Sequence, residues 1–411
     1  MRIALATVGT TGDVVPFTVL SEGLLAAGHQ VTAVSWELYR GAFEEAGSTF
    51  LAAGPMTTEA EIAETAALAA DAGSPLDQVA VLRDFHLRYA ADHYDALKER
   101  LAGHDLVLLH GIHTLAEAAC RDVGVRYATA VFDPVLLPTT SAPPAGMPRL
   151  GPFNRLAWRM LDVMLRREDG PLYSALAAAG SASAHELTMF RARSPLLHLI
   201  AVSPSIAPPP PDLSESTHFT GAWMRDSAPR PLSPEIEAFL AAGDPPIVIT
   251  FGSMTAPDRA ALIDAVAAGV KGAGHRMVLQ DATAANAAES GSDGVLRTGA
   301  VDHRSLLGRA LAVIHHGGAG TSHAVASAGV PSIVIPHVGD QPYWAARLHR
   351  LGVSPAPLPR KKVTATTVTE RVRAASAPST RAAAWALAEK INAERGVEQA
   401  ISLLEALTVS Q

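Results

Sequence analysis

Residues 311–321 read Leu-Ala-Val-Ile-His-His-Gly-Gly-Ala-Gly-Thr, and this stretch determines how the second half of the chain is built. Its first four residues, Leu311–Ile314, are apolar and predict a buried strand. The glycines that follow predict a tight turn, and a helix is expected from about Ser322. A strand that runs through a turn into a helix is the repeating unit of a parallel sheet covered by helices.

The chain opens with the same pattern. Arg2–Val8 predicts a strand, the next loop contains Gly9 and Gly12, and Pro16 suits the first turn of a helix. Further strands are predicted at Gln30–Ser35, Asp105–His110, Arg126–Phe132, Pro246–Phe251, Arg276–Gln280 and Ser332–Ile335. Strands that alternate with helices in both halves predict an α/β fold of two doubly wound, Rossmann-like domains.

The two halves are separated by a proline-rich segment, Ser203–Pro234. Proline at this density predicts a linker rather than a regular element. We therefore expect an N-terminal domain over 1–203, a linker over 204–232 and a C-terminal domain over 233–411, whose last helix is able to pack back on the first domain. Because ligands of open α/β sheets bind at the carboxyl ends of the strands, the two domains are expected to face a shared cleft.

Composition excludes several classes of protein. The chain has 411 residues, of which 48% are apolar and 18% charged, so it can bury a sizeable core. Its 33 basic and 40 acidic residues give a net charge of −7, which disfavours binding to nucleic acid or to an anionic membrane. No stretch approaches the roughly 18 apolar residues that a membrane span needs. The single cysteine, Cys120, rules out an intramolecular disulfide, and we expect a cytoplasmic location.

The glycine-rich turn after Leu311–Ile314 is the strongest chemical signal. Its glycines let a ligand approach the backbone, and the following helix N-terminus offers unpaired N–H groups to an anion such as a diphosphate. The imidazole of His316 can donate a further hydrogen bond. The alternative is a plain turn that binds nothing. The turn is not a P-loop, and the first loop lacks G-x-G-x-x-G, so a dehydrogenase is disfavoured.

Three further signals also follow strands. Asp340 and Gln341 can bond several hydroxyls of a sugar, although Asp340 would also suit a helix N-cap. Asp13 is a candidate general base, with the same alternative. Ser253 follows the strand Pro246–Phe251 and is otherwise an ordinary turn serine.

Several histidines have two interpretations. His86 and His93 are seven residues apart on one predicted helix and share a face, while His110 and His113 follow a predicted strand. They line a pocket for an acceptor substrate or, more commonly, are core and surface groups.

Taken together, three motifs resemble those of the family 1 nucleotide-sugar glycosyltransferases, which have the GT-B fold. They are the turn 315–321, then Gly329-Val330-Pro331, then Gly339-Asp340-Gln341-Pro342. The stretches Gly12–Pro16 and Phe219–Trp223 support the resemblance, which extends over essentially the whole chain. Within the family the chain looks closest to the bacterial natural-product enzymes of the glycopeptide and macrolide type, and to the sterol-type enzymes.

The resemblance assigns donor diphosphate contacts. His316 matches the histidine that bonds the diphosphate, and Ser253 matches a contact on the first loop of the C-terminal domain. The backbone and hydroxyl groups that hold the phosphates are matched by Gly318, Ala319, Gly320 and Thr321.

The resemblance also assigns the other roles. Asp340 and Gln341 match the pair that holds the donor sugar. Val301 and His303 fall where the family's backbone pairs with the nucleobase. Asp13 falls where many members have a catalytic histidine, and where the sterol-like and glycopeptide-type members have aspartate.

Two positions depart from the plant members of the family. Ala300 replaces a tryptophan that stacks on the base, and Ala324 replaces a glutamate that holds the ribose. Loss of that glutamate suits a 2′-deoxyribose donor such as a dTDP-sugar. Sterol-type members lack it too, so UDP and dTDP both stay open.

The resemblance implies an inverting transfer of a sugar to a hydrophobic small molecule, with Asp13 as base and with neither a metal nor a cofactor besides the nucleotide-sugar co-substrate. The acceptor is expected on the N-terminal domain, near Thr57–Ala102 and Leu136–Asp169. Two alternatives are a nucleotide-sugar epimerase of the same fold and a catalytically silent partner protein that binds the sugar nucleotide. The sequence leaves the sugar, the acceptor and the oligomeric state open.

Overall fold

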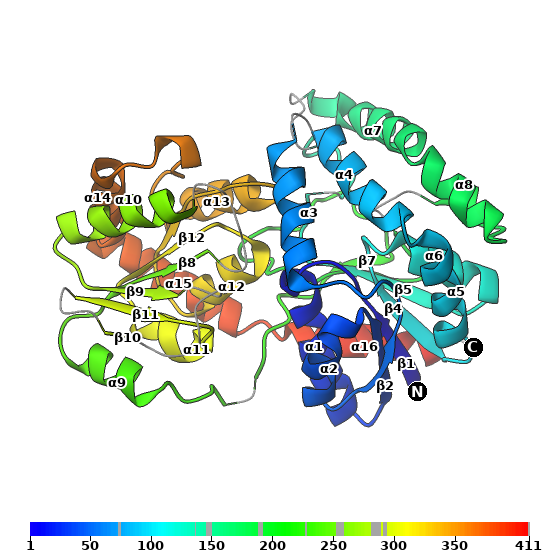
Figure 1. Cartoon of the computed structure of the whole chain (residues 1–411), viewed down its shortest axis with the longest axis horizontal. Helices are drawn as coiled ribbons and strands as arrows, with labels where there is room; N and C mark the ends of the chain where they lie inside the picture. The colour runs from blue at the N-terminus through cyan, green and yellow to red at the C-terminus, as the bar shows by residue number, and fades with distance from the viewer. Residues whose placement is uncertain are drawn as a thin grey trace. The chain divides into compact units, whose positions relative to one another are not determined.

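The computed structural model describes residues 1–72, 75–135, 137–144, 150–187, 192–226, 228–251, 259–280, 289–290 and 294–409. The chain divides into two compact units, Met1–Met224 together with Arg395–Gln411, and Arg225–Glu394. Each unit has a mainly parallel sheet with helices packed on its faces (Figure 1). The predicted α/β fold class is confirmed.

In the first unit the described strands form one parallel sheet in the order β3-β2-β1-β4-β5-β6-β7. Their bounds are Arg2–Ala6 (β1), Gln30–Ser35 (β2), Thr49–Ala52 (β3), Leu106–His110 (β4), Tyr127–Val131 (β5), His198–Ile200 (β6) and Thr217–Phe219 (β7). The strands predicted in this half agree with β1, β2, β4 and β5 to within two residues at each end. The order makes β1 and β4 neighbours, so the segments that follow them meet at one edge.

Alternate residues of these strands point to opposite faces. Ile3 and Leu5 pack with helices α1 and α16, whereas Ala4 and Ala6 pack with helices α5, α6 and α8. The helices of the first unit are Thr11–Ala26 (α1), Arg40–Glu45 (α2), Glu59–Asp71 (α3), Pro75–Leu87 (α4), Ala90–Leu101 (α5), Thr114–Val123 (α6), Asn154–Glu168 (α7), Gly170–Ala178 (α8) and Gly396–Val409 (α16).

The second unit has a sheet in the order β10-β11-β9-β8-β12-β13, in which only the pair β10 and β11 is antiparallel among the described strands. Its strands are Ile247–Thr250 (β8), Met277–Gln280 (β9), Glu289–Ser290 (β10), Val295–Thr298 (β11), Ala312–His315 (β12) and Ser332–Val334 (β13). Its helices are Pro234–Ala241 (α9), Arg259–Gly272 (α10), His303–Leu306 (α11), Ala319–Ser327 (α12), Gln341–Arg350 (α13), Ala365–Ala375 (α14) and Pro378–Asn392 (α15).

The segment expected to be a linker, 204–232, contains one strand and is partly buried. It contains β7, which pairs with β6 and extends the first sheet, and Ile206 and Trp223 are buried. Its prolines lie on either side of β7, where no ladder hydrogen bond is needed. The compact units therefore meet in the sequence after Met224.

The C-terminal helix α16 belongs to the first unit, where it packs on α1. A Cβ atom at Gly23 of α1 would lie 2.5 Å from Val397 Cγ1, so the two helices approach closely at a glycine. Arg126 also donates a hydrogen bond to the Leu407 carbonyl oxygen, at 2.9 Å.

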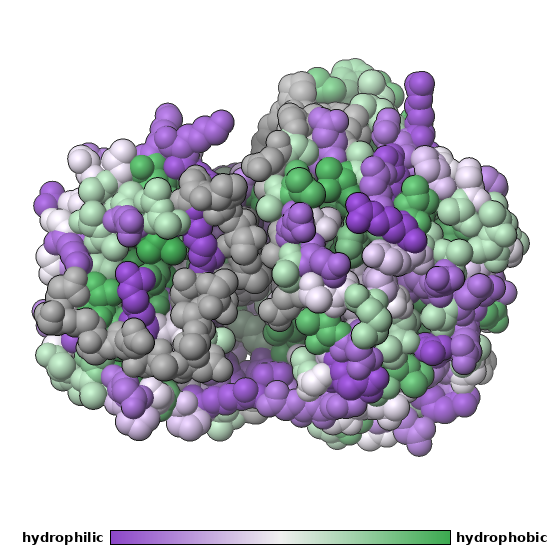
Figure 2. All heavy atoms as spheres, viewed as in Figure 1, coloured by the Kyte–Doolittle hydropathy of each residue, from purple (hydrophilic) through white to green (hydrophobic). Residues whose placement is uncertain are grey.

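Apolar side chains gather in clusters on the faces of both sheets. Hydrophilic side chains occupy much of the face that Figure 2 shows. None of the helices in the described ranges combines the length and the apolar character that crossing a membrane requires.

Candidate active site

Asp13 lies at the start of α1, directly after the β1 loop. Its Oδ2 atom accepts hydrogen bonds from the Thr10 backbone N–H, at 2.8 Å, and from the Thr10 hydroxyl, at 2.9 Å. Gly9 has a φ of +117°, and a Cβ atom there would lie 2.5 Å from Asp13 Oδ2. The loop is therefore built around this carboxylate, and a side chain at position 9 would collide with it.

His110 ends β4 and brings an imidazole to the same edge of the sheet. Its Nε2 atom lies 3.9 Å from Asp13 Oδ1, and its Nδ1 atom lies 3.4 Å from the Val8 carbonyl oxygen. The ring is 3% exposed and packs against Phe17 and Phe132. Burial lowers the pKa of His110, although Asp13 and the Val8 carbonyl act in the opposite direction. The imidazole is therefore neutral at pH 7.

The two oxygens of Asp13 have different neighbours, and this bears on both interpretations of the residue. Oδ2 completes a capping box with Thr10, which is the N-cap of α1. Oδ1 lies on the side of His110, and the side chain is 29% exposed. A partly exposed carboxylate oxygen beside a buried neutral imidazole is suited to accepting a proton from a substrate hydroxyl. Capping and catalysis are therefore compatible in one side chain.

Three buried ring nitrogens lie in the same unit: Trp36 Nε1, His93 Nε2 and His113 Nε2. Within the described ranges, no hydrogen-bond partner reaches any of the three. The rings of His93 and His113 are 5.3 Å apart. A Cβ atom at Gly54 would lie 2.7 Å from Trp36 Nε1 and 3.1 Å from His93 Cε1, so these two side chains also converge. His86 packs on Trp36 at 6.2 Å between ring centroids.

This histidine group predicts a loss of stability in acid. Burial lowers the pKa of His93 to about 3 and that of His86 to about 4, from 6.5. Between pH 6.5 and about 4, these histidines are protonated in the unfolded chain and neutral in the folded chain. The free energy of unfolding should therefore fall as pH drops through this range, by about 1.4 kcal/mol per pH unit for each of the two histidines. Urea denaturation at several pH values checks this. His93→Gln should reduce the slope by about one proton, and an unchanged slope would contradict the explanation.

The strand, turn and helix predicted around residue 315 are present in the second unit. β12 ends at His315, but α12 begins at Ala319, three residues earlier than the sequence indicated, with Gly318 as its N-cap. The first turn of a helix has N–H groups that no carbonyl of that helix can accept. Here they belong to Ala319, Gly320 and Thr321.

Two glycines shape the turn. Gly317 has a φ of +90°, and a Cβ atom there would lie 2.6 Å from Val334 Cγ1. A Cβ atom at Gly318 would lie 2.6 Å from His316 Nε2. The His316 ring therefore lies against the backbone at the point where α12 begins.

Buried polar atoms without partners are concentrated at this turn. Among the described residues, none bonds to His315 Nε2, His316 Nδ1 or Ser322 Oγ. His315 Nδ1 accepts the Gly317 N–H at 3.1 Å, which leaves the ring proton on Nε2. Burial, together with neighbouring histidines, lowers the pKa of His316 to about 4. Neutral donors beside a helix N-terminus are suited to binding an anion.

Asp340 and Gln341 lie at the start of α13 and both are held in place. The Trp344 indole N–H donates to Asp340 Oδ2 at 2.5 Å. Asp340 occupies the N-cap position, as its alternative interpretation expected, but its side chain makes no capping bond. Gln341 Oε1 accepts the backbone N–H groups of His337, at 2.7 Å, and Val338, at 3.1 Å.

The predicted nucleobase residues follow β11. His303 is the first residue of α11, and its Nε2 atom lies 2.9 Å from Gln280 Oε1 at the end of β9. Val301 is half-buried two residues earlier, and Ser253 lies outside the described residues. The predicted donor residues that can be placed therefore lie at the carboxyl edge of one sheet, whereas Asp13 belongs to the other unit.

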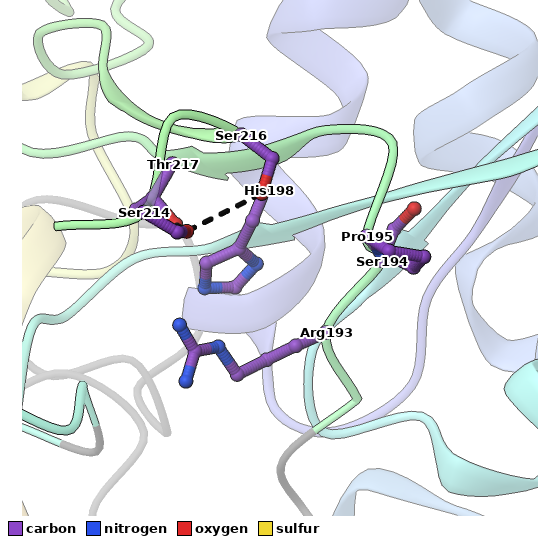
Figure 3. Close-up of a pocket in the computed structure, with 7 residues that line it drawn as sticks. All are labelled: Arg193, Ser194, Pro195, His198, Ser214, Ser216 and Thr217. Carbon is purple, nitrogen blue, oxygen red and sulfur yellow. Dashed lines mark hydrogen bonds between the residues drawn. The ribbon is translucent and has the colours of Figure 1, made fainter.

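A separate pocket of about 240 Å³ occurs in the first unit (Figure 3). Its lining includes His198 and Thr217, which begin β6 and β7, and Arg193. It therefore lies at the amino ends of the strands, the edge opposite to Asp13. No sequence pattern indicated this pocket, and it does not adjoin the candidate catalytic residues.

Residues 262–407 match the family described as erythromycin biosynthesis protein CIII-like, C-terminal domain. An O-mycaminosyltylonolide 6-deoxyallosyltransferase of Streptomyces fradiae is 32% identical, over 98% of this chain and 97% of that protein. A vancomycin aglycone glucosyltransferase of Amycolatopsis orientalis is 31% identical, over 99% and 98%. The solved structure of the glycosyltransferase VinC in complex with dTDP is similar over both whole chains, with a TM-score of 0.69 and 20% identity.

Proposed function

The chain belongs to the glycosyltransferases of natural-product biosynthesis, which have the GT-B fold, and from this premise we propose that it transfers a sugar from UDP or dTDP to a hydroxyl of a hydrophobic small molecule. One observation carries the proposal. The turn at residues 315–321 gathers unpartnered buried donors at the N-terminus of α12, which is what a diphosphate requires.

The second unit is proposed to bind the donor. The diphosphate would lie on the N–H groups of Ala319, Gly320 and Thr321, with His316 and Ser253 beside it. Asp340 and Gln341 would hold hydroxyls of the sugar, and the backbone at Val301 and His303 would pair with the base. The indole of Trp344 supports this role for Asp340, because it fixes the orientation of the carboxylate.

The first unit is proposed to bind the acceptor and to supply the base. Asp13 Oδ1 takes the proton of the acceptor hydroxyl while the acceptor oxygen bonds to the anomeric carbon. The bond from that carbon to the diphosphate oxygen breaks in the same step, so the anomeric configuration inverts. Because Oδ2 is held by Thr10, the proton is expected on Oδ1, where His110 is 3.9 Å away. We regard His110 as a positioning residue for this carboxylate.

We also propose that the reaction needs no metal ion. The negative charge on the departing diphosphate would be stabilised by the N-terminus of α12 and by His316, which are preorganised to receive it. Among the described residues, no three histidine, cysteine, aspartate or glutamate side chains gather as metal ligands do. EDTA is therefore expected to leave the rate of transfer unchanged.

Two other functions are not favoured. An epimerase would rearrange the sugar of its nucleotide without an acceptor, and a silent partner would bind the nucleotide without turnover. The relatives that cover nearly the whole chain have names that describe transfer to an acceptor. The residues proposed for transfer, Asp13, His316 and Asp340, are all present.

Mass spectrometry tests the proposal. The protein is incubated with UDP- and dTDP-sugars and with macrolide and glycopeptide aglycones, the acceptor classes that the names of the relatives suggest. A product heavier than its aglycone by one sugar, with inverted anomeric configuration by NMR, is expected. An isomerised sugar nucleotide in the absence of any acceptor would instead show an epimerase.

A further inference from the structure

His337 is a half-buried imidazole with a buried Nδ1 atom beside the proposed diphosphate turn, and none of the donor-site roles described above uses its side chain. It follows β13, the strand that pairs with β12. The Ile335 N–H donates to the His315 carbonyl oxygen at 2.9 Å, so the segments that hold His337 and His316 run side by side. Within the described ranges, no hydrogen-bond partner reaches His337 Nδ1.

Among the described residues, few groups face His337. From the turn after β12 come His316 and, behind it, His315. From the end of β8 comes the uncharged ring of Phe251, 5.7 Å away between centroids. From α13, Gln341 holds the His337 backbone N–H, and the Asp340 carboxylate accepts the Trp344 indole.

One more titratable group is close to this set. His303, on α11, contributes to lowering the pKa of both His315 and His316. Asp302 in turn acts to raise the pKa of His303, against the larger effect of burial. The described part of the site therefore brings His337 and His303 close to His316, while His315 is fully buried. An anion bound at this turn would therefore meet neutral hydrogen-bond donors.

We propose that His337 is a second donor-site imidazole, and that it takes up a proton from solvent when the nucleoside diphosphate binds beside His316. The inference rests on the proposed function, because it assumes a diphosphate at this turn. The charged imidazole would then donate a charge-assisted hydrogen bond to the phosphate oxygens.

The physical reason is that a bound diphosphate would change the electrostatic surroundings of the His337 imidazole. Burial lowers the pKa of His337 in the free protein, while the Ile335 carbonyl raises it. Burial and neighbouring histidines hold the pKa of His316 at about 4 and that of His315 at about 3, so protonating either of these rings costs more. A bound diphosphate places at least two negative charges nearby, which favours the charged form of an imidazole. Binding should therefore strengthen as pH falls.

Isothermal titration calorimetry of the whole chain with UDP and dTDP tests the inference. Titrations in buffers of different ionisation enthalpy count the protons exchanged on binding. They should be run between pH 7 and 9, where the terminal phosphate, with a pKa of about 6, is already ionised. We expect net uptake of up to one proton near pH 7 and an affinity that falls with rising pH, by at most about tenfold per unit.

Two variants identify the side chain that takes up the proton. His337→Gln should abolish the uptake and weaken binding about tenfold at pH 7, with a smaller effect at pH 9. His349→Gln, an exposed histidine on α13, is the matched control and should change neither quantity. Binding without proton uptake in the wild-type protein, or uptake that survives His337→Gln, would overturn this inference and leave the proposed function standing. Failure of both nucleotides to bind would overturn the proposed function as well.

Discussion

Asp13→Asn should lower kcat by roughly three orders of magnitude while leaving the Kd for the nucleoside diphosphate unchanged. An amide cannot accept the proton of the acceptor hydroxyl, and that proton has to leave as the new bond forms. Nucleotide binding should survive because the proposed diphosphate contacts are all in the second unit. Steady-state transfer rates and calorimetric titration of the same preparation measure the two quantities.

The fold should tolerate this substitution. An asparagine oxygen can still accept the Thr10 N–H and hydroxyl that now bond to Oδ2. Asp105→Asn is the matched control, because Asp105 precedes β4 at the opposite edge of the same sheet and pairs with Arg2. It should keep nearly full turnover. If Asp13→Asn also turned over near the wild-type rate, another group would have to be the base.

His316→Ala should have the second largest effect, with a different signature. Removing this donor should lower kcat by about 10²- to 10³-fold, since in the proposed mechanism it stabilises the charge that develops on the leaving diphosphate. It should also weaken nucleotide binding by about tenfold, because the contact exists in the ground state too. Transfer rates and the Kd for UDP and dTDP should therefore change together, unlike in Asp13→Asn.

Loss of folding is another possible cause of low activity in His316→Ala, and it has to be tested. His316 lies against Gly318, so the alanine variant needs a check of its melting temperature and circular dichroism. His349→Ala on the exposed surface of α13 should leave kcat and Kd as they are. A folded His316→Ala protein that binds nucleotide and turns over normally would contradict the placement of the diphosphate at this turn.

Much of the proposed donor site follows from local features of the sequence. The apolar run before His315, the glycines after it and the Asp340–Gln341 pair each follow a strand within a few residues. Parallel strands deliver such segments to one edge of a sheet without any knowledge of strand order. The predicted start of α12 was three residues too late, because Gly318 serves as its N-cap in place of a polar side chain.

The contact between Asp13 and His110 was harder to predict because it depends on pairing between strands that are distant in the sequence. His110 reaches Asp13 only because β4 pairs with β1 across about a hundred residues, and no local pattern shows which strands are neighbours. The strand β7 inside the proline-rich segment was missed for the same reason, because it forms by pairing with β6. Buried atoms without partners, such as His337 Nδ1, become visible only when packing is known.

A thermal-shift measurement with UDP, dTDP, GDP and ADP tests the central claim most directly, because it needs neither the acceptor nor the sugar. A nucleotide that binds the folded chain raises its melting temperature, and the shift grows with the logarithm of its concentration divided by Kd. We expect UDP or dTDP at millimolar concentration to raise it by a few degrees, about 2–4 °C, and His316→Ala to remove most of that shift. No shift with any of the four would contradict a diphosphate site at residues 315–321.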